Sequence, residues 1–377
     1  MKQTKLHLSM MLLAVLATGC SKDNTPELTG NGDAVELGIT AGVELTKSAI
    51  QSGTQTGNGV TIMQEVGVLA KNVTDSETDY GTNNSAVYTQ STSWSSTAPI
   101  YLTAQKAVIY GYYPVYANDA NGNKNSTPIT VTNPTTPLTA TIPIAVFVGG
   151  DTETGTAPYL KANSTITDAD NSSDGSILSA PGELDYMWES TSSRTNVSNR
   201  VGDAQSVALN MSHALSMVSF KIYKDASYKG TGKLSKIILK NVDAGGTDLS
   251  TGGSSMAMKI ADGTISGQSA TGATYTRLIV SSAGAADGAD LATSSSAAHS
   301  YSIVVLPGTA DRNKIQVVLT IDGVDYTVKL ADATSSTEWA VGANNTYAVK
   351  LSGTALSITS VTVAAWTSNS AGNLDAK

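Results

Sequence analysis

Apolar and polar residues alternate over a long stretch close to the N-terminus. Between residues 35 and 45 every odd position is apolar, whereas every even position is Glu, Gly or Thr. The apolar residues are Val35, Leu37, Ile39, Ala41, Val43 and Leu45. A period of two is typical of a β-strand that buries one face, so the pattern predicts one long strand with a fully buried face. Burial of six apolar side chains would stabilise the fold by roughly 10 kcal/mol or more.

Shorter β-rich runs recur along the rest of the chain between clusters of Gly, Asn, Asp and Ser. They lie at residues 60–69, 107–113, 138–148, 206–211, 216–223, 234–239, 276–281, 301–306, 315–321, 326–330, 346–351 and 356–365. No segment has a long helical period, and no repeat with a fixed period of about 20–50 residues occurs. The sequence therefore predicts an all-β fold of the sandwich or barrel type.

The last of these runs changes phase part-way along. Its apolar residues are first Leu356 and Ile358, at even positions, and then Val361, Val363 and Ala365, at odd positions. An extra residue in one strand of a pair produces such a shift. The pattern predicts a β-bulge between positions 359 and 360, or else two shorter strands with different roles.

A polar stretch rich in Ser and Thr separates the two halves of the chain. It covers residues 151–200 and is interrupted by the apolar segment Leu184–Trp188. A chain of 377 residues is long enough for about two domains. We place the boundary near residue 203, which gives an N-terminal β-sandwich domain at 35–203 and a C-terminal one at 204–377.

The first twenty residues have the features of a bacterial lipoprotein signal. Lys2 and Lys5 precede an apolar core at Leu8–Ala17, which is too short for a membrane-spanning helix. The segment Leu16–Cys20 resembles a lipobox, and Cys20 is the single Cys of the chain. We expect residues 1–19 to be removed, Cys20 to carry fatty acyl chains such as palmitate, and residues 20–34 to form a tether to the outer membrane. An ordinary secretory signal with an incidental Cys is the alternative.

Composition excludes several kinds of partner and site. The formal net charge is −8, and it becomes −10 when residues 1–19 take away two of the 23 basic residues and none of the 31 acidic ones. An acidic chain lacks the basic surface that nucleic acid requires. A single Cys cannot form an internal disulfide or a Cys-based metal site. The low charged fraction of 14% suits an extracellular β-protein.

Residues that could support catalysis are scarce. After processing, the chain keeps only His213 and His299, which are far apart in the sequence, and it has no G-x-S-x-G motif. Two of the three residues Glu183, Asp185 and Glu189 could be imagined as the carboxylate pair of a glycosidase, but nothing in the sequence fixes their separation. We expect no enzymatic activity and no cofactor.

Two loops resemble ligand-binding motifs only in part. The stretch Asp168–Gly175 carries alternating oxygen ligands up to Asp174, as half of a calcium loop does, but Pro181 stands where a bidentate Glu is required. Calcium there and a plain acidic loop both stay open. Residues 230–233 (Gly-Thr-Gly-Lys) lack the spacing of a phosphate-binding loop and precede a strand, so we interpret them as a turn.

Several segments resemble the fimbrillin family of Bacteroides and Porphyromonas in their order along the chain. They are Ala107–Tyr116, Leu184–Trp188, His213–Ile222, Leu234–Val242 and Ile358–Trp366. One departure is Ala365, because many members place Pro before the final Trp. The resemblance implies two tandem transthyretin-like β-sandwich domains. It also implies a type V pilin, exported as an outer-membrane lipoprotein, that loses its first strand to a trypsin-like protease and polymerises by donor-strand exchange into adhesive surface fimbriae.

Under this hypothesis the strand at residues 35–47 is the removable one, and the bond between Lys47 and Ser48 suits a trypsin-like protease. A strand of the next subunit would then fill the open groove by β-addition. The candidate donor contains Leu356, Ile358, Val361, Val363 and Ala365, although the same residues could simply form the last intramolecular strand. The partners are other subunits in a head-to-tail filament, the protease, the outer membrane and a surface receptor.

A surface lipoprotein that binds carbohydrate or a host ligand is the alternative function. Such a protein would present clustered exposed aromatic residues, whereas Trp94, Trp188, Trp339 and Trp366 each lie in or beside a different predicted strand. The polar region 151–200 could form an adhesive loop. The sequence does not decide between a shaft, tip or anchor subunit.

Overall fold

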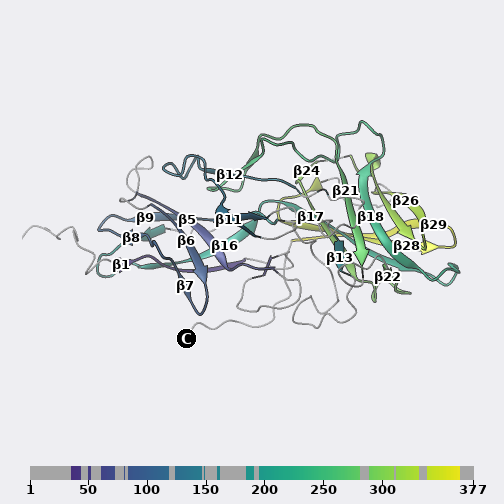
Figure 1. Cartoon of the computed structure of the whole chain (residues 1–377), viewed down its shortest axis with the longest axis horizontal. Helices are drawn as coiled ribbons and strands as arrows, with labels where there is room; N and C mark the ends of the chain where they lie inside the picture. The colour runs from purple at the N-terminus through teal and green to yellow at the C-terminus, as the bar shows by residue number, and fades with distance from the viewer. Residues whose placement is uncertain are drawn as a thin grey trace, which may run out of the picture.

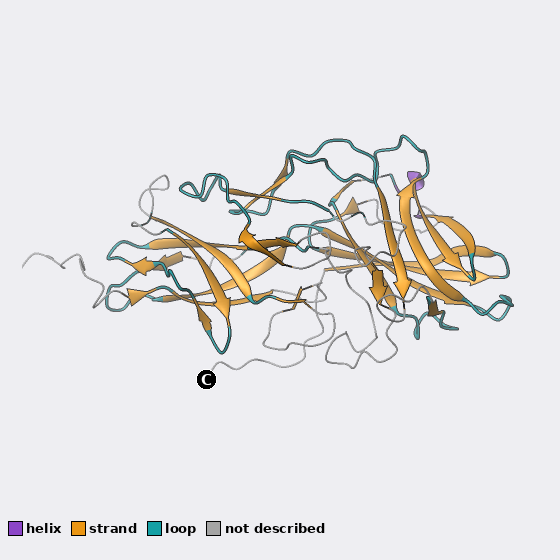
Figure 2. Cartoon of the chain, viewed as in Figure 1, coloured by secondary structure: helices purple, strands orange, loops and turns teal. Residues whose placement is uncertain are grey.

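The computed structural model describes residues 35–43, 50–51, 61–72, 80, 84–118, 124–146, 148, 159–161, 184–190, 195–280, 288–309, 311–330 and 338–365. The predicted all-β fold is confirmed. Within these ranges the regular structure consists of strands, apart from one 3-10 turn, η2 (Arg312–Lys314) (Figure 2). The molecule is elongated, with strands from the two halves of the chain at opposite ends (Figure 1). None of the described residues belongs to a helix that could span a membrane.

The N-terminal end is built on a large sheet. Across it lie β2 (Gly38–Val43), β16 (Ser206–His213), β14 (Met187–Glu189), β9 (Ala107–Tyr113), β5 (Glu65–Asn72), β6 (Ser85–Gln90) and β7 (Trp94–Ser95), with β15 (Thr195–Val197) beside β9. Smaller pairs are β1 (Val35–Glu36) with β8 (Tyr101–Leu102), β3 (Ile50–Gln51) with β4 (Thr61–Ile62), and β10 (Tyr116–Asn118) with β11 (Lys124–Pro128). Val68, Ile109 and Leu209 from the large sheet share one buried cluster with Ile100 and Leu102. This cluster is the N-terminal core.

The C-terminal end is a β-sandwich. One sheet contains β23 (Ser300–Val305), β17 (Ser216–Lys224), β28 (Ala343–Ser352) and β29 (Ala355–Ala365). The other contains β13 (Tyr159–Lys161), β21 (Thr274–Val280), β18 (Lys233–Asn241), β25 (Ile315–Ile321) and β26 (Val324–Lys329), with β22 (Ala289–Asp290) beside β18. Phe220 and Val349 of the first sheet pack in one cluster with Ile237 and Leu319 of the second. The two sheets therefore enclose a common C-terminal core.

A third apolar cluster joins the two ends. It lies beside the small sheet of β12 (Thr141–Pro143), β19 (Ala257–Lys259) and β20 (Ile265–Ser266). A separate two-stranded sheet consists of β24 (Gly308–Thr309) and β27 (Glu338–Trp339). The cluster combines Tyr112 and Ile142 with Met217 and Met258. Residues from both halves of the chain are therefore buried together in this third cluster.

The chain passes from one large sheet to the other between β16 and β17. The strand β16 pairs with β14 and β2 in the N-terminal sheet, and the next strand, β17, begins at Ser216 in the C-terminal sheet. The crossing thus lies at residues 214–215. The earlier strand β13 pairs with β21 in the C-terminal sheet. The boundary near residue 203 between two domains stays a prediction.

Candidate functional site

The first strand lies at the edge of the N-terminal sheet. β2 pairs with β16 in parallel, from Gly38 opposite Ser206 to Val43 opposite Met211. The preceding residues form β1, which pairs antiparallel with β8 in a different sheet. The expected single strand is therefore divided at Leu37, where the chain changes partner. In the part of the chain that the structure describes, no second strand is hydrogen-bonded to β2.

The predicted alternation is confirmed where the structure describes side chains. Leu37 and Ile39 are buried in the N-terminal core, with 1% and 6% of their surface exposed, whereas Glu36 and Thr40 are exposed. Val35 and Ala41 are half-buried and pack against the same core. Two fully buried side chains stabilise the attached strand by about 3–6 kcal/mol. The first strand thus inserts apolar side chains into the N-terminal core, and we call its described part, residues 35–43, the wedge.

Backbone and hydroxyl hydrogen bonds fix the wedge at Leu37. Its N–H donates to the carbonyl of Ile100 at 2.8 Å, and its carbonyl accepts from the Tyr88 hydroxyl at 3.0 Å. The next amide, of Gly38, donates to the Gln205 carbonyl at 2.9 Å. Burial raises the pKa of Tyr88 to about 12, so its hydroxyl keeps its proton and remains a donor. Removal of the strand would take these hydrogen bonds away from the buried residues Ile100 and Tyr88.

Several predicted site residues lie outside the described residues. They are Cys20, Leu45, Lys47, Ser48, Trp366, Glu183 and the acidic loop Asp168–Asp174, and the same holds for the side chains of Val43 and Ala365. Lipidation, proteolytic cleavage and calcium binding therefore stay predictions. Within the described residues, no group of three or more His, Cys, Asp or Glu side chains could hold a metal ion.

The last strand forms an antiparallel hairpin with β28 and lies at the edge of its sheet. Its pairing runs from Ser352 opposite Ala355 to Ala343 opposite Ala365. Val349 faces Ile358 and Ala348 faces Ser360, which leaves Thr359 as the extra residue. The predicted bulge is thus confirmed. It turns Leu356, Ile358 and Val361 toward the C-terminal core, although the phase of the sequence changes between them.

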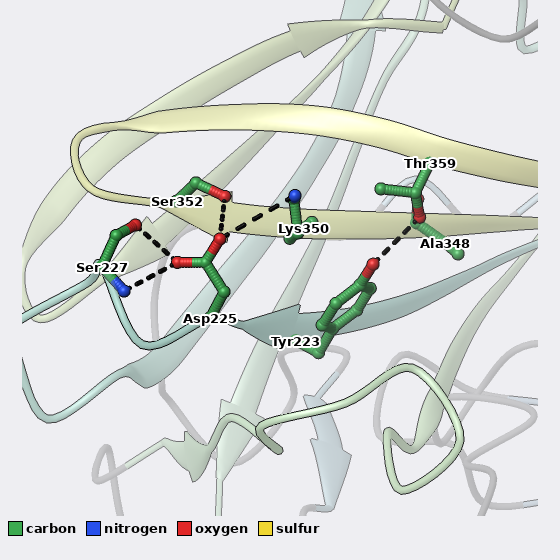
Figure 3. A network of polar contacts seen from close by, with 7 residues as sticks. All are labelled: Tyr223, Asp225, Ser227, Ala348, Lys350, Ser352 and Thr359. Carbon is green, nitrogen blue, oxygen red and sulfur yellow. Dashed lines mark hydrogen bonds and ion pairs between the residues drawn. The ribbon is translucent and has the colours of Figure 1, made fainter.

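Polar contacts on the outer face join the last strand to β17. The Tyr223 hydroxyl contacts the Thr359 hydroxyl at 3.1 Å, and Thr359 donates to the Ala348 carbonyl at 3.2 Å (Figure 3). At the hairpin end, the Asp225 carboxylate accepts from the Ser352 hydroxyl at 2.6 Å and from the Ser227 amide at 2.9 Å. Hydrogen bonds from Ser227 and then Ser352 lower the pKa of Asp225 to about 2. The carboxylate is therefore ionised at neutral pH.

Comparison of the sequence with models of protein families identifies the family of this chain. The family model described as fimbrillin-like matches residues 152–366, which is more than half of the chain. This chain belongs to the fimbrillin-like family. The match contains four of the five segments that carried the resemblance, and Ala107–Tyr116 lies outside it. A search of curated proteins finds no match.

Solved structures resemble this fimbrillin-like protein in fold. A fimbrial protein from Bacteroides vulgatus is 13% identical, with a TM-score of 0.51, and the alignment covers 89% of this chain and 99% of that one. A candidate cell adhesion protein from Bacteroides uniformis is 15% identical, with a TM-score of 0.50 and the same coverage. At such low sequence identity, these structures show only that the fold is similar.

Two of the fimbrillin-like segments, Leu184–Trp188 and His213–Ile222, meet where the two halves of the molecule join. His213 at the end of β16 places its Nδ1 2.8 Å from Oδ2 of Asp185, and both residues are buried. Trp188 packs against Gly263, where an added Cβ would lie 2.1 Å from the indole Nε1 and where φ is +70°. The Asp185–His213 pair leaves no signal in the sequence, because the two residues are 28 positions apart. The Asp185 side chain thus has a buried partner within its own chain.

The other candidate loop and the Trp residues also have internal roles. Gly232 and Lys233 each donate a backbone N–H to the Asp322 carboxylate at 2.8 Å. Although burial raises the pKa of Asp322, hydrogen bonds from Thr231, Tyr228 and these amides lower it well below its usual range. The loop therefore binds a carboxylate of its own chain. Trp94, Trp188 and Trp339 pack in or against three different clusters. The exposed aromatic patch that the carbohydrate-binding alternative requires is not formed by these three residues.

Proposed function

We propose that this protein is a structural subunit of cell-surface fimbriae that polymerises by donor-strand exchange and has no enzymatic role. The observation that carries the proposal is the wedge formed by the first strand. It occupies a sheet edge and places Leu37 and Ile39 in the N-terminal core. Membership of the fimbrillin-like family supports a fimbrial role.

Loss of the wedge would create a binding site for another strand. The outer edge of β16, the Ile100 carbonyl and the Tyr88 hydroxyl would lose their backbone partners, and the sites of Leu37 and Ile39 would be empty. An extended segment of alternating apolar residues supplies both the hydrogen bonds and the side chains that such a groove requires. While the first strand stays covalently attached, its high effective concentration excludes competitors. Cleavage removes that advantage.

The donor in this proposal is the last strand of a second copy of the chain. β29 is itself an edge strand, and it carries apolar residues in a period of two on each side of its bulge. Because the groove lies at one end of the molecule and β29 belongs to the other, each contact would be head-to-tail (Figure 1). A heterologous contact of this kind does not close, so it extends into a filament.

Export and processing complete the proposal. Cys20 would carry the lipid that anchors the subunit to the outer membrane before assembly. A trypsin-like protease would then cut between Lys47 and Ser48 and release the lipid, the tether and the first strand together. Assembled fimbriae on the cell surface would contact other cells or a receptor.

Limited trypsin digestion of the exported chain, residues 20–377, tests the proposal. We expect a new N-terminus at Ser48, followed by ladders of oligomers that resist SDS. Lys47→Gln should block both results, whereas Lys22→Gln, in the tether, should block neither. A chain that is cut after Lys47 and remains monomeric would contradict strand exchange. Cys20→Ser should abolish membrane fractionation, and unchanged anchoring would contradict the lipoprotein assignment.

A further inference from the structure

The bulge in β29 separates two segments that are held in different ways. The inner segment, Ala355–Ile358, follows the hairpin turn and places Leu356 and Ile358, both half-buried, against the C-terminal core. In the outer segment, Ser360–Ala365, only Val361 packs against that core among the residues whose side chains are described. Val363 has 44% of its surface exposed. The outer segment therefore depends mainly on its backbone pairing with β28.

The bulge is held by a side chain that crosses a whole strand. The order in this sheet is β17, β28 and β29, so Tyr223 on β17 extends over β28 to reach Thr359 on β29 (Figure 3). Thr359 in turn donates to the Ala348 carbonyl, next to the point where the register changes. Two hydroxyl contacts thus meet at the residue that the bulge leaves without a direct partner.

A second set of contacts holds the end of β28, directly before the turn that leads into the inner segment. Asp225, directly after β17, accepts from the Ser352 hydroxyl, and its amide donates to the Leu351 carbonyl at 3.0 Å. The ammonium group of Lys350 lies 3.8 Å from the same carboxylate. These contacts fix the turn between β28 and β29 but touch nothing beyond the bulge.

We propose that Thr359 is a pivot, and that Tyr223 and Asp225 are positioning residues which decide how much of β29 can leave its sheet. Asp225 retains the inner segment on its own subunit, whereas Tyr223 controls release of the outer segment, Ser360–Ala365. The partner of the released segment is the vacated groove of a second copy, and this part rests on the proposed function. The C-terminal core would then stay covered by Leu356 and Ile358 during exchange.

Hydrogen–deuterium exchange of the unprocessed exported chain tests the pivot without polymerisation. In Tyr223→Phe and Thr359→Val, the amides of residues 361–365 should exchange about two- to tenfold faster, as expected for one lost hydrogen bond, while residues 355–358 should not change. Asp225→Asn should instead accelerate the amides at 353–358. Thr359→Ser keeps the hydroxyl group, so its amides at residues 361–365 should exchange at the wild-type rate. Tyr275→Phe is the matched control, because it removes a hydroxyl bond to the Ser250 carbonyl in the other sheet.

The outcomes separate the pivot from the proposed function. Equal acceleration on both sides of Thr359, or none in either variant, would overturn the pivot. If the outer segment alone is released, the pivot stands, and trypsin-triggered assembly of Tyr223→Phe should proceed faster than that of the wild type. Local release in Tyr223→Phe with an unchanged assembly rate would support the pivot and contradict the donor role of β29.

Discussion

The first and last strands are both edge strands, but they are held by different forces. The first strand places two side chains inside the N-terminal core, and the buried Tyr88 hydroxyl binds its backbone. The last strand lies over the C-terminal core with half-buried side chains, and its polar contacts lie on the outer face of the sheet. Removal of the first strand would expose an apolar cavity, whereas partial removal of the last would expose mainly a sheet edge.

This difference suits the two strands to opposite roles. A wedge with buried apolar contacts leaves slowly unless the chain is cut, because its burial free energy and its covalent attachment both oppose release. A strand fixed by hydroxyl contacts on the outer face can separate in steps, because each contact contributes only about 0.5–1.5 kcal/mol.

The largest effect is expected where the two regions join. His213→Ala would remove the partner of the buried Asp185 side chain, and the loss of one member of such a buried pair costs about 3–5 kcal/mol. Because this pair lies at the crossing between the sheets, we expect both ends of the molecule to unfold at lower urea concentration, in one transition. Tryptophan fluorescence and circular dichroism should report the same midpoint.

His299→Ala is the control for this variant, since His299 is exposed and should leave the midpoint unchanged. Two separate transitions in the His213 variant would mean that the ends are independent domains. The contributions of the first and last strands to stability would then have to be measured separately, each in its own domain.

The next effect compares one Leu in each strand. Leu37→Ala should lower the free energy of unfolding by about 2–5 kcal/mol, because it leaves a cavity in the N-terminal core. Leu356→Ala should cost roughly half as much, because the side chain is half-buried. Urea unfolding measures both, and Thr40→Ala, an exposed position of the first strand, gives the baseline. A larger loss of unfolding free energy for Leu356→Ala than for Leu37→Ala would contradict the conclusion that the first strand is the more deeply buried of the two.

The sequence could predict these strands because their alternation is a local property. The period of two identified the buried faces of Leu37 and Ile39, and the phase change after Ile358 located the bulge. It could not identify the parallel partner of β2, because β16 lies more than 160 positions further along the chain. Nor could it relate Tyr223 to Thr359, because polar residues on an exposed face give no periodic signal. The change of partner at Leu37 depends on such distant contacts, with Ile100 and Tyr88.

A smaller effect compares the two Tyr hydroxyl groups that hold the strands. Tyr88→Phe removes a buried donor and leaves the Leu37 carbonyl unsatisfied, which should cost about 1–3 kcal/mol of unfolding free energy. Tyr223→Phe removes a contact in an exposed setting, leaves no buried group unsatisfied, and should lower the global value by less than Tyr88→Phe does, by about 0.5–1.5 kcal/mol. Equal losses in urea unfolding would contradict the division into a buried and an outer attachment.

The smallest effect is a local response of the last strand to acid. Hydrogen bonds from Ser227 and Ser352 lower the pKa of Asp225 to about 2, below the ordinary value of about 3.9 for an Asp in an unfolded chain. A group whose pKa is depressed on folding contributes stability that is fully present above the unfolded value and is lost as the pH falls toward the folded value. The hairpin end at residues 353–358 should therefore exchange its amides faster as the pH falls from about 4 to about 2, after correction for intrinsic rates.

Asp225→Asn provides the decisive comparison, because it keeps the shape of the side chain and removes its titration. In this variant, exchange at residues 353–358 should be fast at neutral pH and should change little across the same acid range. The first strand serves as the internal reference, since none of its hydrogen bonds to Ile100, Tyr88 and Gln205 involves a carboxylate. If the wild type and the variant respond to acid in parallel at the hairpin end, another group controls the response and Asp225 does not hold the turn.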